Sequence, residues 1–152
     1  MEKMGMRSFY YSRALREAVF FLWERQKGSK LHCAEFRSKA AAGLRFGKGR
    51  LVYDHAIPFN YLQNELLHLP EGFPTDLLRD TLNKFCRVAL ITRQENDRLQ
   101  AAAYQSKIPG DWDGIDHLAR YKAVGGIEIE KNTFARARQR LDQSVRAGNR
   151  SE

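Results

Sequence analysis

Two short apolar runs, rather than one long one, constrain the fold of this chain most. LVY (51–53) leads into the charged pair Asp54–His55, and CRVALI (86–91) leads into the polar segment TRQE. Short apolar runs bounded by polar residues are typical of buried strands, and we expect strands at 51–54 and 86–91. Two strands are too few for a doubly wound sheet. We therefore expect an α+β protein that is predominantly helical, with a small two-stranded β element near the middle of the chain.

Most of the remaining chain has apolar residues at helical spacing. In the segment TRQE, Thr92 and Glu95 have the Thr-x-x-Glu form of a capping box, which marks a helix start. The segment GLRFGKGR (43–50) holds three glycines and is expected to be a loop. The predicted helices are 8–26, 31–42, 59–69, 75–85, 93–103, 116–124 and 132–147.

The size and composition of the chain indicate one globular domain. The sequence has 152 residues, of which 43% are hydrophobic, and we expect residues 1–147 to form the domain and 148–152 a frayed tail. No apolar run approaches the roughly 20 residues of a membrane span, so no membrane partner is expected. Cys33 and Cys86 are far apart in sequence and form no CxxC pair, which favours a reduced, cytoplasmic protein.

The charge distribution points to a polyanionic partner. Residues 1–50 hold 12 Lys and Arg against 4 Asp and Glu, a net of +8, and 131–152 hold 6 against 2, a net of +4. Residues 51–130 hold 8 against 12, a net of −4. Basic surface is the electrostatic footprint of nucleic-acid binding, although a charge run is also typical of a solvated face. We expect nucleic acid as the partner, DNA in preference to RNA.

Asp54 and His55 are the candidate chemical groups. A histidine has an unperturbed pKa near 6.5 and can activate water, and a carboxylate is a preferred ligand of Mg²⁺. Adjacent strand residues point to opposite faces of a sheet, so the pair can share one target only where the strand ends. Pro58, three residues after Asp54, favours such an end.

The segments VYDHAIP (52–58) and ALITRQENDRL (89–99) together resemble the HNH, or ββα-metal (His-Me finger), endonuclease superfamily. In that superfamily a histidine that closes the first strand is the general base. The resemblance implies that His55 is the base and that Asp54 holds one divalent cation, Mg²⁺ or Mn²⁺. The second metal ligand would be Asn96, or else Glu95 or Asp97 in the same helical turn.

Several of these residues also have purely structural interpretations. Asp54 and His55 can form a structural pair, in which the acid caps the next helix and the imidazole bonds to the backbone. Glu95 can be only the return half of the capping box, and Asn96 and Asp97 are ordinary residues for a first helical turn. A second potential cation site comprises Asp111, Asp113, Asp116 and His117.

The expected contacts to nucleic acid come from two basic segments. Arg45, Lys48 and Arg50 precede the Asp-His pair and can clamp phosphates beside it, and Arg136 and Arg140 share one face of the last predicted helix. The leading interpretation is a metal-dependent nuclease that hydrolyses phosphodiester bonds. The alternatives are a nucleic-acid-binding protein without catalysis and a protein-interaction module or inhibitor, with aromatic surface from Phe9, Tyr10 and Tyr11.

Overall fold

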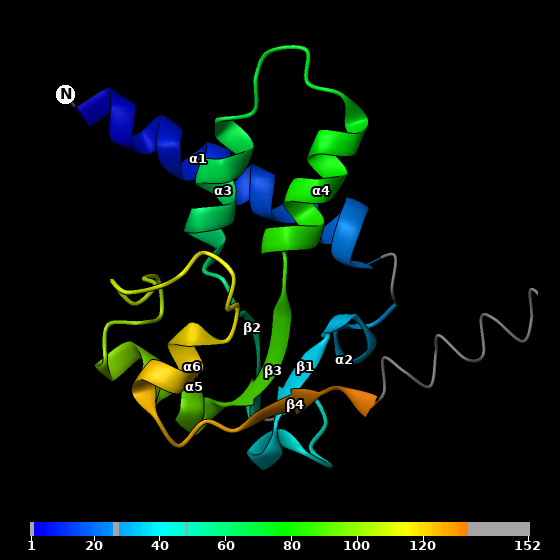
Figure 1. Cartoon of the computed structure of the whole chain (residues 1–152), viewed down its shortest axis with the longest axis vertical. Coiled ribbons are helices and arrows are strands. Elements are labelled where there is room, and N and C mark those ends of the chain that lie inside the picture. The colour runs from blue at the N-terminus through cyan, green and yellow to red at the C-terminus, as the bar shows by residue number, and fades with distance from the viewer. Residues whose placement is uncertain (1, 26–27, 48, 134–152) are drawn as a thin grey trace, which may run out of the picture.

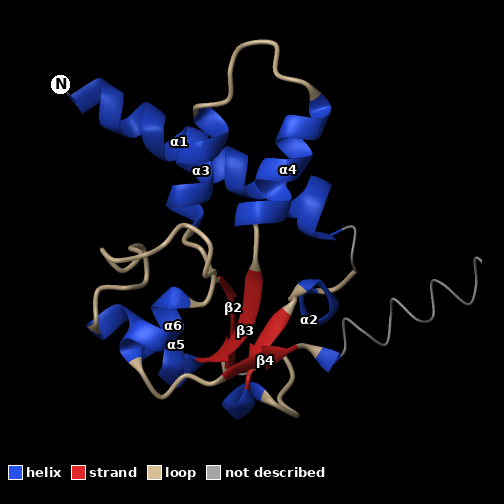
Figure 2. Ribbon diagram, in the orientation of Figure 1, coloured by secondary structure: helices blue, strands red, loops and turns tan. Residues whose placement is uncertain are grey.

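Four short strands form one mixed sheet in the computed structural model, which describes residues 2–25, 28–47 and 49–133. The strands are β1 (Phe36–Ser38), β2 (Leu51–His55), β3 (Val88–Thr92) and β4 (Ile129–Lys131). Their order across the sheet is β2-β3-β1-β4. β3 pairs antiparallel with β2 and parallel with β1, and β4 pairs antiparallel with β1. The chain is α+β (Figure 2).

Helices cover both faces of this sheet and one of its ends (Figure 1). A π-helix, η1 (Phe20–Glu24), continues the first α-helix, and a 3₁₀-helix, η3 (Lys39–Ala41), follows β1. Within the described residues the α-helices are α1 (Glu2–Val19), α2 (Lys30–Cys33), α3 (Phe59–Leu67), α4 (Thr75–Phe85), α5 (Arg93–Ala101) and α6 (Ala119–Val124).

The expectation of a predominantly helical chain with a two-stranded element is therefore wrong. The predicted helix 31–42 contains only α2 and η3, with β1 between them. β1 forms because Phe36 and Ser38 turn inward and the strand pairs with both β3 and β4, so long-range pairing overrides local helical periodicity. β4 was not predicted, and the predicted helix 132–147 lies almost wholly outside the described residues.

The other predicted elements are present with modest shifts in their bounds. The strand predicted at 51–54 is β2, and the strand predicted at 86–91 is β3, which begins two residues later. The helix predicted at 75–85 is α4 with the same bounds, and the capping box of Thr92 and Glu95 opens α5. Local signals were sufficient here because each element carries its own cap or its own apolar periodicity.

Successive side chains of β3 alternate between two separate hydrophobic cores, one on each face of the sheet. Ala89 and Ile91 face a cluster that includes Leu99 of α5 and Tyr121 of α6. The neighbouring residues Val88 and Leu90 face the opposite side, which α2 covers. All residues of β3 except Thr92 are buried, as expected for a central strand with both faces covered.

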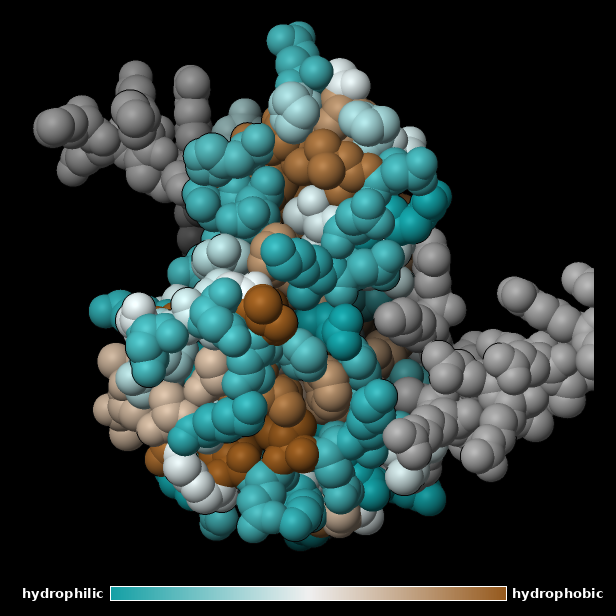
Figure 3. All heavy atoms as spheres, in the orientation of Figure 1, coloured by the Kyte–Doolittle hydropathy of each residue, from teal (hydrophilic) through white to brown (hydrophobic). Residues whose placement is uncertain are grey.

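α1, α3 and α4 form a separate helical layer beyond one end of the sheet (Figure 1). The chain order places the layer at this end of the sheet, because α3 follows β2 and α4 precedes β3. The α3–α4 hairpin therefore joins two antiparallel strands at the end where β2 stops. Apolar surface is visible over this hairpin (Figure 3), and the exposed Leu67, Phe73 and Leu77 belong to it.

Candidate metal centre

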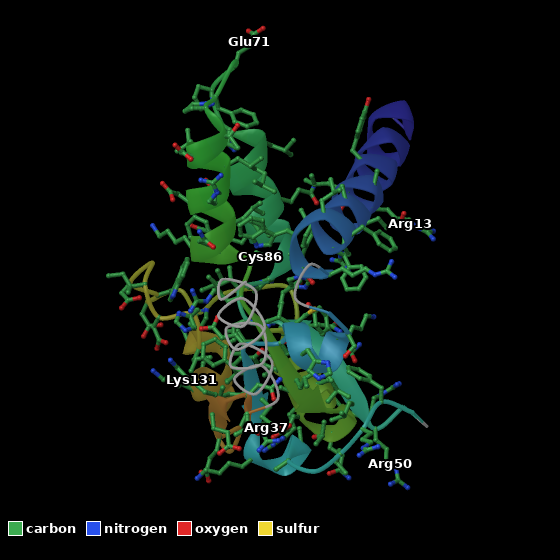
Figure 4. All side chains as sticks on the ribbon, turned by 90° about the vertical axis from the view of Figure 1, so that its right-hand side faces the viewer. Arg13, Arg37, Arg50, Glu71, Cys86 and Lys131 are labelled. Atoms are coloured by element: carbon green, nitrogen blue, oxygen red, sulfur yellow. The ribbon has the colours of Figure 1, made fainter. Side chains whose placement is uncertain are left out.

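A buried glutamate lies where the helical layer meets the sheet. Glu24 is the last residue of η1 and is only 4% exposed. A buried carboxylate is costly unless it is paired or hydrogen-bonded, and three side chains supply those bonds. They are Tyr53 and His55 from β2 and Cys86, the C-cap residue that directly follows α4. The label of Cys86 in Figure 4 marks this junction.

The two carboxylate oxygens of Glu24 have different partners. Tyr53 donates its hydroxyl to Oε2 at 2.6 Å. His55 Nε2 lies 2.7 Å from Oε1, and Cys86 Sγ donates to the same oxygen at 3.4 Å. Glu24, His55 and Cys86 each present one ligand atom, and the three atoms all lie within 4.8 Å of one another.

These contacts set the charge of the centre. Burial alone would raise the pKa of Glu24, but the hydrogen bond and charge of His55, helped by the bonds from Tyr53 and Cys86, lower that pKa below its ordinary value. Burial and the adjacent Glu24 raise the pKa of Tyr53 far above its ordinary value. The centre therefore holds a carboxylate with a phenol that remains protonated and donates to it.

The sheet register explains why these residues meet. Tyr53 and His55 are two positions apart on β2 and share a face of the sheet. His55 pairs with Val88 of β3, two residues after Cys86, so the antiparallel pairing brings the end of α4 beside the imidazole. Phe59, at the start of α3, packs edge-on against His55 with 5.4 Å between ring centroids.

The backbone at the end of η1 is also fixed. Cys33 donates its thiol to the carbonyl oxygen of Glu24 at 2.9 Å and to that of Gly28 at 3.2 Å. The N–H of Arg25 reaches back to the carbonyl of Phe20, the wide π-helical bond. Single π turns inside helices occur frequently at functional sites. This one extends the last turn of the helix and ends at the buried carboxylate.

The ligand atoms fit Zn²⁺ better than a hard cation. Thiolate and imidazole ligands suit Zn²⁺, whereas Mg²⁺ and Mn²⁺ prefer oxygen ligands. Atoms around tetrahedral Zn²⁺ lie roughly 3.3–3.8 Å apart, given bonds of about 2.0–2.3 Å. Cys86 Sγ and Glu24 Oε1 already have such a separation at 3.4 Å. The 2.7 Å pair of His55 and Glu24 would have to open by roughly 0.6–1 Å.

Asp54 does not face this centre. β2 continues through His55, so Asp54 and His55 point to opposite faces of the sheet. Asp54 Oδ2 accepts from Arg120 Nη2 at 2.7 Å and from the hydroxyl of Tyr121 at 2.6 Å. Burial and the charge of Asp54 raise the pKa of Tyr121 well above its ordinary value, so the phenol donates. The structure thus gives Asp54 the role of an ion-pair partner beneath α6.

The structure also separates the 95–97 turn from His55. Thr92, which caps α5, pairs with Leu51 at the start of β2, whereas His55 is at the other end of that strand. Glu95 is buried and binds Ser38 Oγ at 2.6 Å and the N–H of Thr92 at 2.8 Å.

Asn96 and Asp97 belong to the same first turn of α5. Asp97 forms an exposed ion pair with Arg93. The predicted metal ligands therefore do not converge on one point, because the register between β2 and β3 places them at opposite ends of the strand pair.

The remaining predicted binding residues divide between described and undescribed segments. Arg45 lies in the loop between η3 and β2, and Arg50 directly precedes β2; both are exposed. Lys48, Arg136 and Arg140 lie outside the described residues. The aromatic surface predicted from Phe9, Tyr10 and Tyr11 can be assessed only at Tyr11, which is 72% exposed.

The second potential cation site has contacts of a structural kind. Asp113 accepts from the N–H groups of Ile115 and Asp116, and Asp116 pairs with Lys122 at 2.6 Å. His117 stacks on Phe36, with 5.1 Å between centroids. These bonds shape the loop before α6. Within residues 2–25, 28–47 and 49–133, the candidate metal group is Glu24, His55 and Cys86.

Sequence reasoning found His55 but missed its neighbours. Glu24 follows the apolar run AVFFLW (18–23), where a carboxylate is the residue least expected to be buried. A carboxylate directly after such an apolar run was the sequence signal that could have identified Glu24 as a site residue. Cys86 opens a predicted strand, and a single cysteine outside any CxxC motif predicts nothing by itself. Only the β2–β3 register brings the three side chains together.

Comparison with known proteins adds no further assignment. No protein-family model, curated protein or solved structure shows a significant match to the chain. Among the described residues, no helix has the length and the apolar character needed to cross a membrane. The site geometry and the charge distribution therefore carry the functional argument.

Proposed function

We propose that the chain binds one transition-metal ion, Zn²⁺ first, through Glu24, His55 and Cys86. The observation that carries this proposal is the convergence of three different ligand types within 4.8 Å of one another around a buried carboxylate. A carboxylate, an imidazole and a thiolate are each established ligands of Zn²⁺ in proteins.

The surroundings of the three ligands support this proposal. Ligating side chains usually have outer partners that fix their orientation. Glu24 has such a partner in Tyr53, which occupies Oε2 and leaves Oε1 directed at His55 and Cys86. Three protein ligands leave the fourth tetrahedral position of Zn²⁺ for water or substrate, as in hydrolytic zinc sites.

Cobalt substitution tests the proposal directly. Titration of the protein with Co²⁺ should give a thiolate-to-cobalt charge-transfer band that saturates at one ion per chain, and Zn²⁺ should displace it. Cys86→Ser should lose this band, and Glu24→Gln and His55→Gln should weaken cobalt binding. A wild-type protein without the band, or a Cys86→Ser variant that retains it, would contradict the proposal.

The chain offers a matched control in its other cysteine. Cys33 is buried near the same glutamate, but its thiol donates to backbone carbonyls. Cys33→Ser should therefore keep the cobalt band. Thermal unfolding of each variant shows whether a lost band reflects lost ligation or lost folding.

Hydrolysis of nucleic acid is a second candidate function. Two observations favour it: the formal net charge of +8, and the succession of β2, β3 and α5, an antiparallel strand pair followed by a helix, as the HNH resemblance implies. If His55 ligates the metal it does not act as the base, so metal-bound water would be the nucleophile. Asp54 would have no direct role.

A plasmid-nicking assay tests this candidate separately from metal binding. Wild type, His55→Ala and Cys86→Ser are prepared identically and assayed with Zn²⁺, Mg²⁺ or Mn²⁺ and with EDTA. Cleavage that needs Zn²⁺ and both side chains would support hydrolysis at this centre. Cleavage that needs His55 but not Cys86, in Mg²⁺, would favour the role of general base. Equal cleavage by all three proteins would indicate a contaminant.

A further inference from the structure

A strip of cations and aromatic rings runs along α1, η1 and α2 beside the candidate metal centre. We call it the α1–α2 strip and define it as Arg16, Phe20, Phe21, Arg25 and Lys30. Phe21 is 53% exposed, and Arg16, Arg25 and Lys30 are also exposed. The strip is distinct from the basic segments around Arg45 and Arg136 that the sequence indicated.

Each cation of the strip lies over an aromatic ring. Arg25 Cζ is 5.5 Å from the ring centroid of Phe21. Lys30 Nζ is 5.4 Å from that of Phe20 and 5.6 Å from that of Tyr53. Arg16 Cζ is 4.8 Å from the ring of Phe59. Contacts of this kind orient the cations while leaving their charges uncompensated.

These three cations lack carboxylate partners among the residues that the structure describes. Elsewhere on the surface, neighbouring acids compensate cations, as in the pairs Arg13–Glu17 and Arg79–Asp76. A row of uncompensated cations attracts a polyanion. The exposed ring of Phe21 adds something that a purely electrostatic surface lacks: an apolar plane at which a flat group can stack.

We propose that the α1–α2 strip binds single-stranded nucleic acid. Surfaces that bind single strands combine cations along the backbone with aromatic side chains on which bases stack. A double helix keeps its base faces inside the stack, so it can use the cations but not the ring of Phe21. The strip therefore predicts preference for single strands over duplex at equal charge.

The position of the strip deepens the second candidate function. Tyr53 contacts Lys30 through its ring and donates its hydroxyl to Glu24. A strand held by Lys30 would thus lie one side chain away from the candidate metal centre. Binding by the strip needs no metal, however, so this inference and the hydrolytic proposal fail or succeed in different experiments.

Fluorescence anisotropy with a labelled oligothymidylate tests the proposal in EDTA. A length of about 20 nucleotides exceeds the roughly 4–16 that one OB fold, a common single-strand-binding domain, covers. Phe21→Ala should weaken binding by about 5- to 150-fold, the equivalent of roughly 1–3 kcal/mol of base stacking. If Lys30 contacts one phosphate, Lys30→Met should reduce the magnitude of the negative slope of log K against log salt by about 0.7.

The structure supplies a matched control for the aromatic variant. Phe73 is also exposed, at 40%, but it lies in the α3–α4 hairpin. Phe73→Ala should bind the oligonucleotide as the wild type does. Circular dichroism melts of both alanine variants separate lost binding from lost folding.

Four results would overturn the proposal. Two concern variants: equal affinity of wild type and Phe21→Ala, and equal loss of affinity in Phe73→Ala. The other two concern ligands: equal affinity for heparin, a polyanion without bases, and equal affinity for duplex of the same length. Strand binding without cleavage of the bound oligonucleotide in Zn²⁺, Mg²⁺ or Mn²⁺ would support the strip and remove hydrolysis at the candidate metal centre.

Discussion

The ion pair of Arg120 and Asp54 gives the sharpest prediction, because the structure and the sequence resemblance assign Asp54 different roles. The side chain of Arg120 is 1% exposed and that of Asp54 is 13% exposed. The guanidinium also donates to the backbone carbonyls of His55 and Ala56 and to those of Tyr104 and Gln105. Arg120 therefore ties the end of β2 to the loop after α5.

Removing this guanidinium should destabilise the protein strongly. Breaking a buried ion pair from one side costs roughly 3–5 kcal/mol, because the remaining charge is left without a partner. For a chain of this size each kcal/mol lowers Tm by roughly 2–4 °C. Arg120→Met should therefore lower Tm by roughly 6–20 °C. Total stability is commonly only about 5–15 kcal/mol, so Arg120→Lys and Asp54→Asn serve as milder variants.

Thermal melting of the wild type and Arg120→Met, monitored by circular dichroism, measures this fall in Tm. Urea unfolding, monitored in the same way, compares the wild type with Arg120→Lys, Asp54→Asn and the double variant. Each single change should destabilise the protein, and the double variant should cost less than the sum of the two, because the groups act on each other. Cobalt binding by folded Asp54→Asn should match the wild type. A stable Asp54→Asn protein that no longer binds cobalt would refute this reasoning and make Asp54 a metal ligand.

Three further predictions concern Glu24, Tyr53 and Glu95. Tyr53→Phe removes the bond to Oε2 of Glu24 and should weaken Zn²⁺ affinity about 10–100-fold, measured by competition with a chromophoric chelator. The pKa of Glu24 is lowered on folding from its ordinary 4.5. The ionised carboxylate therefore contributes stability above pH 4.5, and this contribution is lost as the pH falls through the lower pKa of the folded state. In urea titrations the stability difference between wild type and Glu24→Gln should shrink in acid. Glu95→Gln disturbs the capping box and the bond to Ser38 and should cost about 1–2 kcal/mol in urea unfolding, without changing cobalt binding.

Elements with their own local signals could be predicted from the sequence. α4 has apolar residues at helical spacing, and α5 has a reciprocal cap between Thr92 and Glu95. β2 and β3 have apolar runs closed by polar residues. In each case the information lies within about a dozen neighbouring residues, which is the range over which periodicity can be detected.

Elements that depend on distant partners could not be predicted in this way. β1 has three residues, and its partners in β3 and β4 lie roughly 50 and 90 positions later. The local sequence around Phe36 has helical periodicity, and only the pairing decides the outcome. β4 is equally short, with no flanking turn strong enough to predict a strand from three residues.

The same distinction explains the outcome for the candidate site. His55 was identified because it ends an apolar run, which is local information. Its partners Glu24 and Cys86 lie about 30 positions away on either side and meet it only through tertiary packing. Asp54 was assigned to the same site because the sequence does not show that β2 continues past it. Since His55 is also paired in β2, the side chains of Asp54 and His55 point to opposite faces of the sheet.

The π turn of η1 fixes the direction of the buried carboxylate through the backbone as well as through side-chain bonds. An α-helix advances about 100° for each residue, since it has 3.6 residues per turn, and the turn closed by the bond from Arg25 to Phe20 holds one residue more than an α-helical turn. A change that closed this turn as an ordinary α-helix without shortening the chain would therefore rotate Glu24 by about 100° relative to α1. The carboxylate would leave Tyr53 and His55 although every ligand type was still encoded. A related sequence can retain the centre only if it keeps the wide turn or also lacks one residue in it, because that deletion would return Glu24 to nearly its present direction.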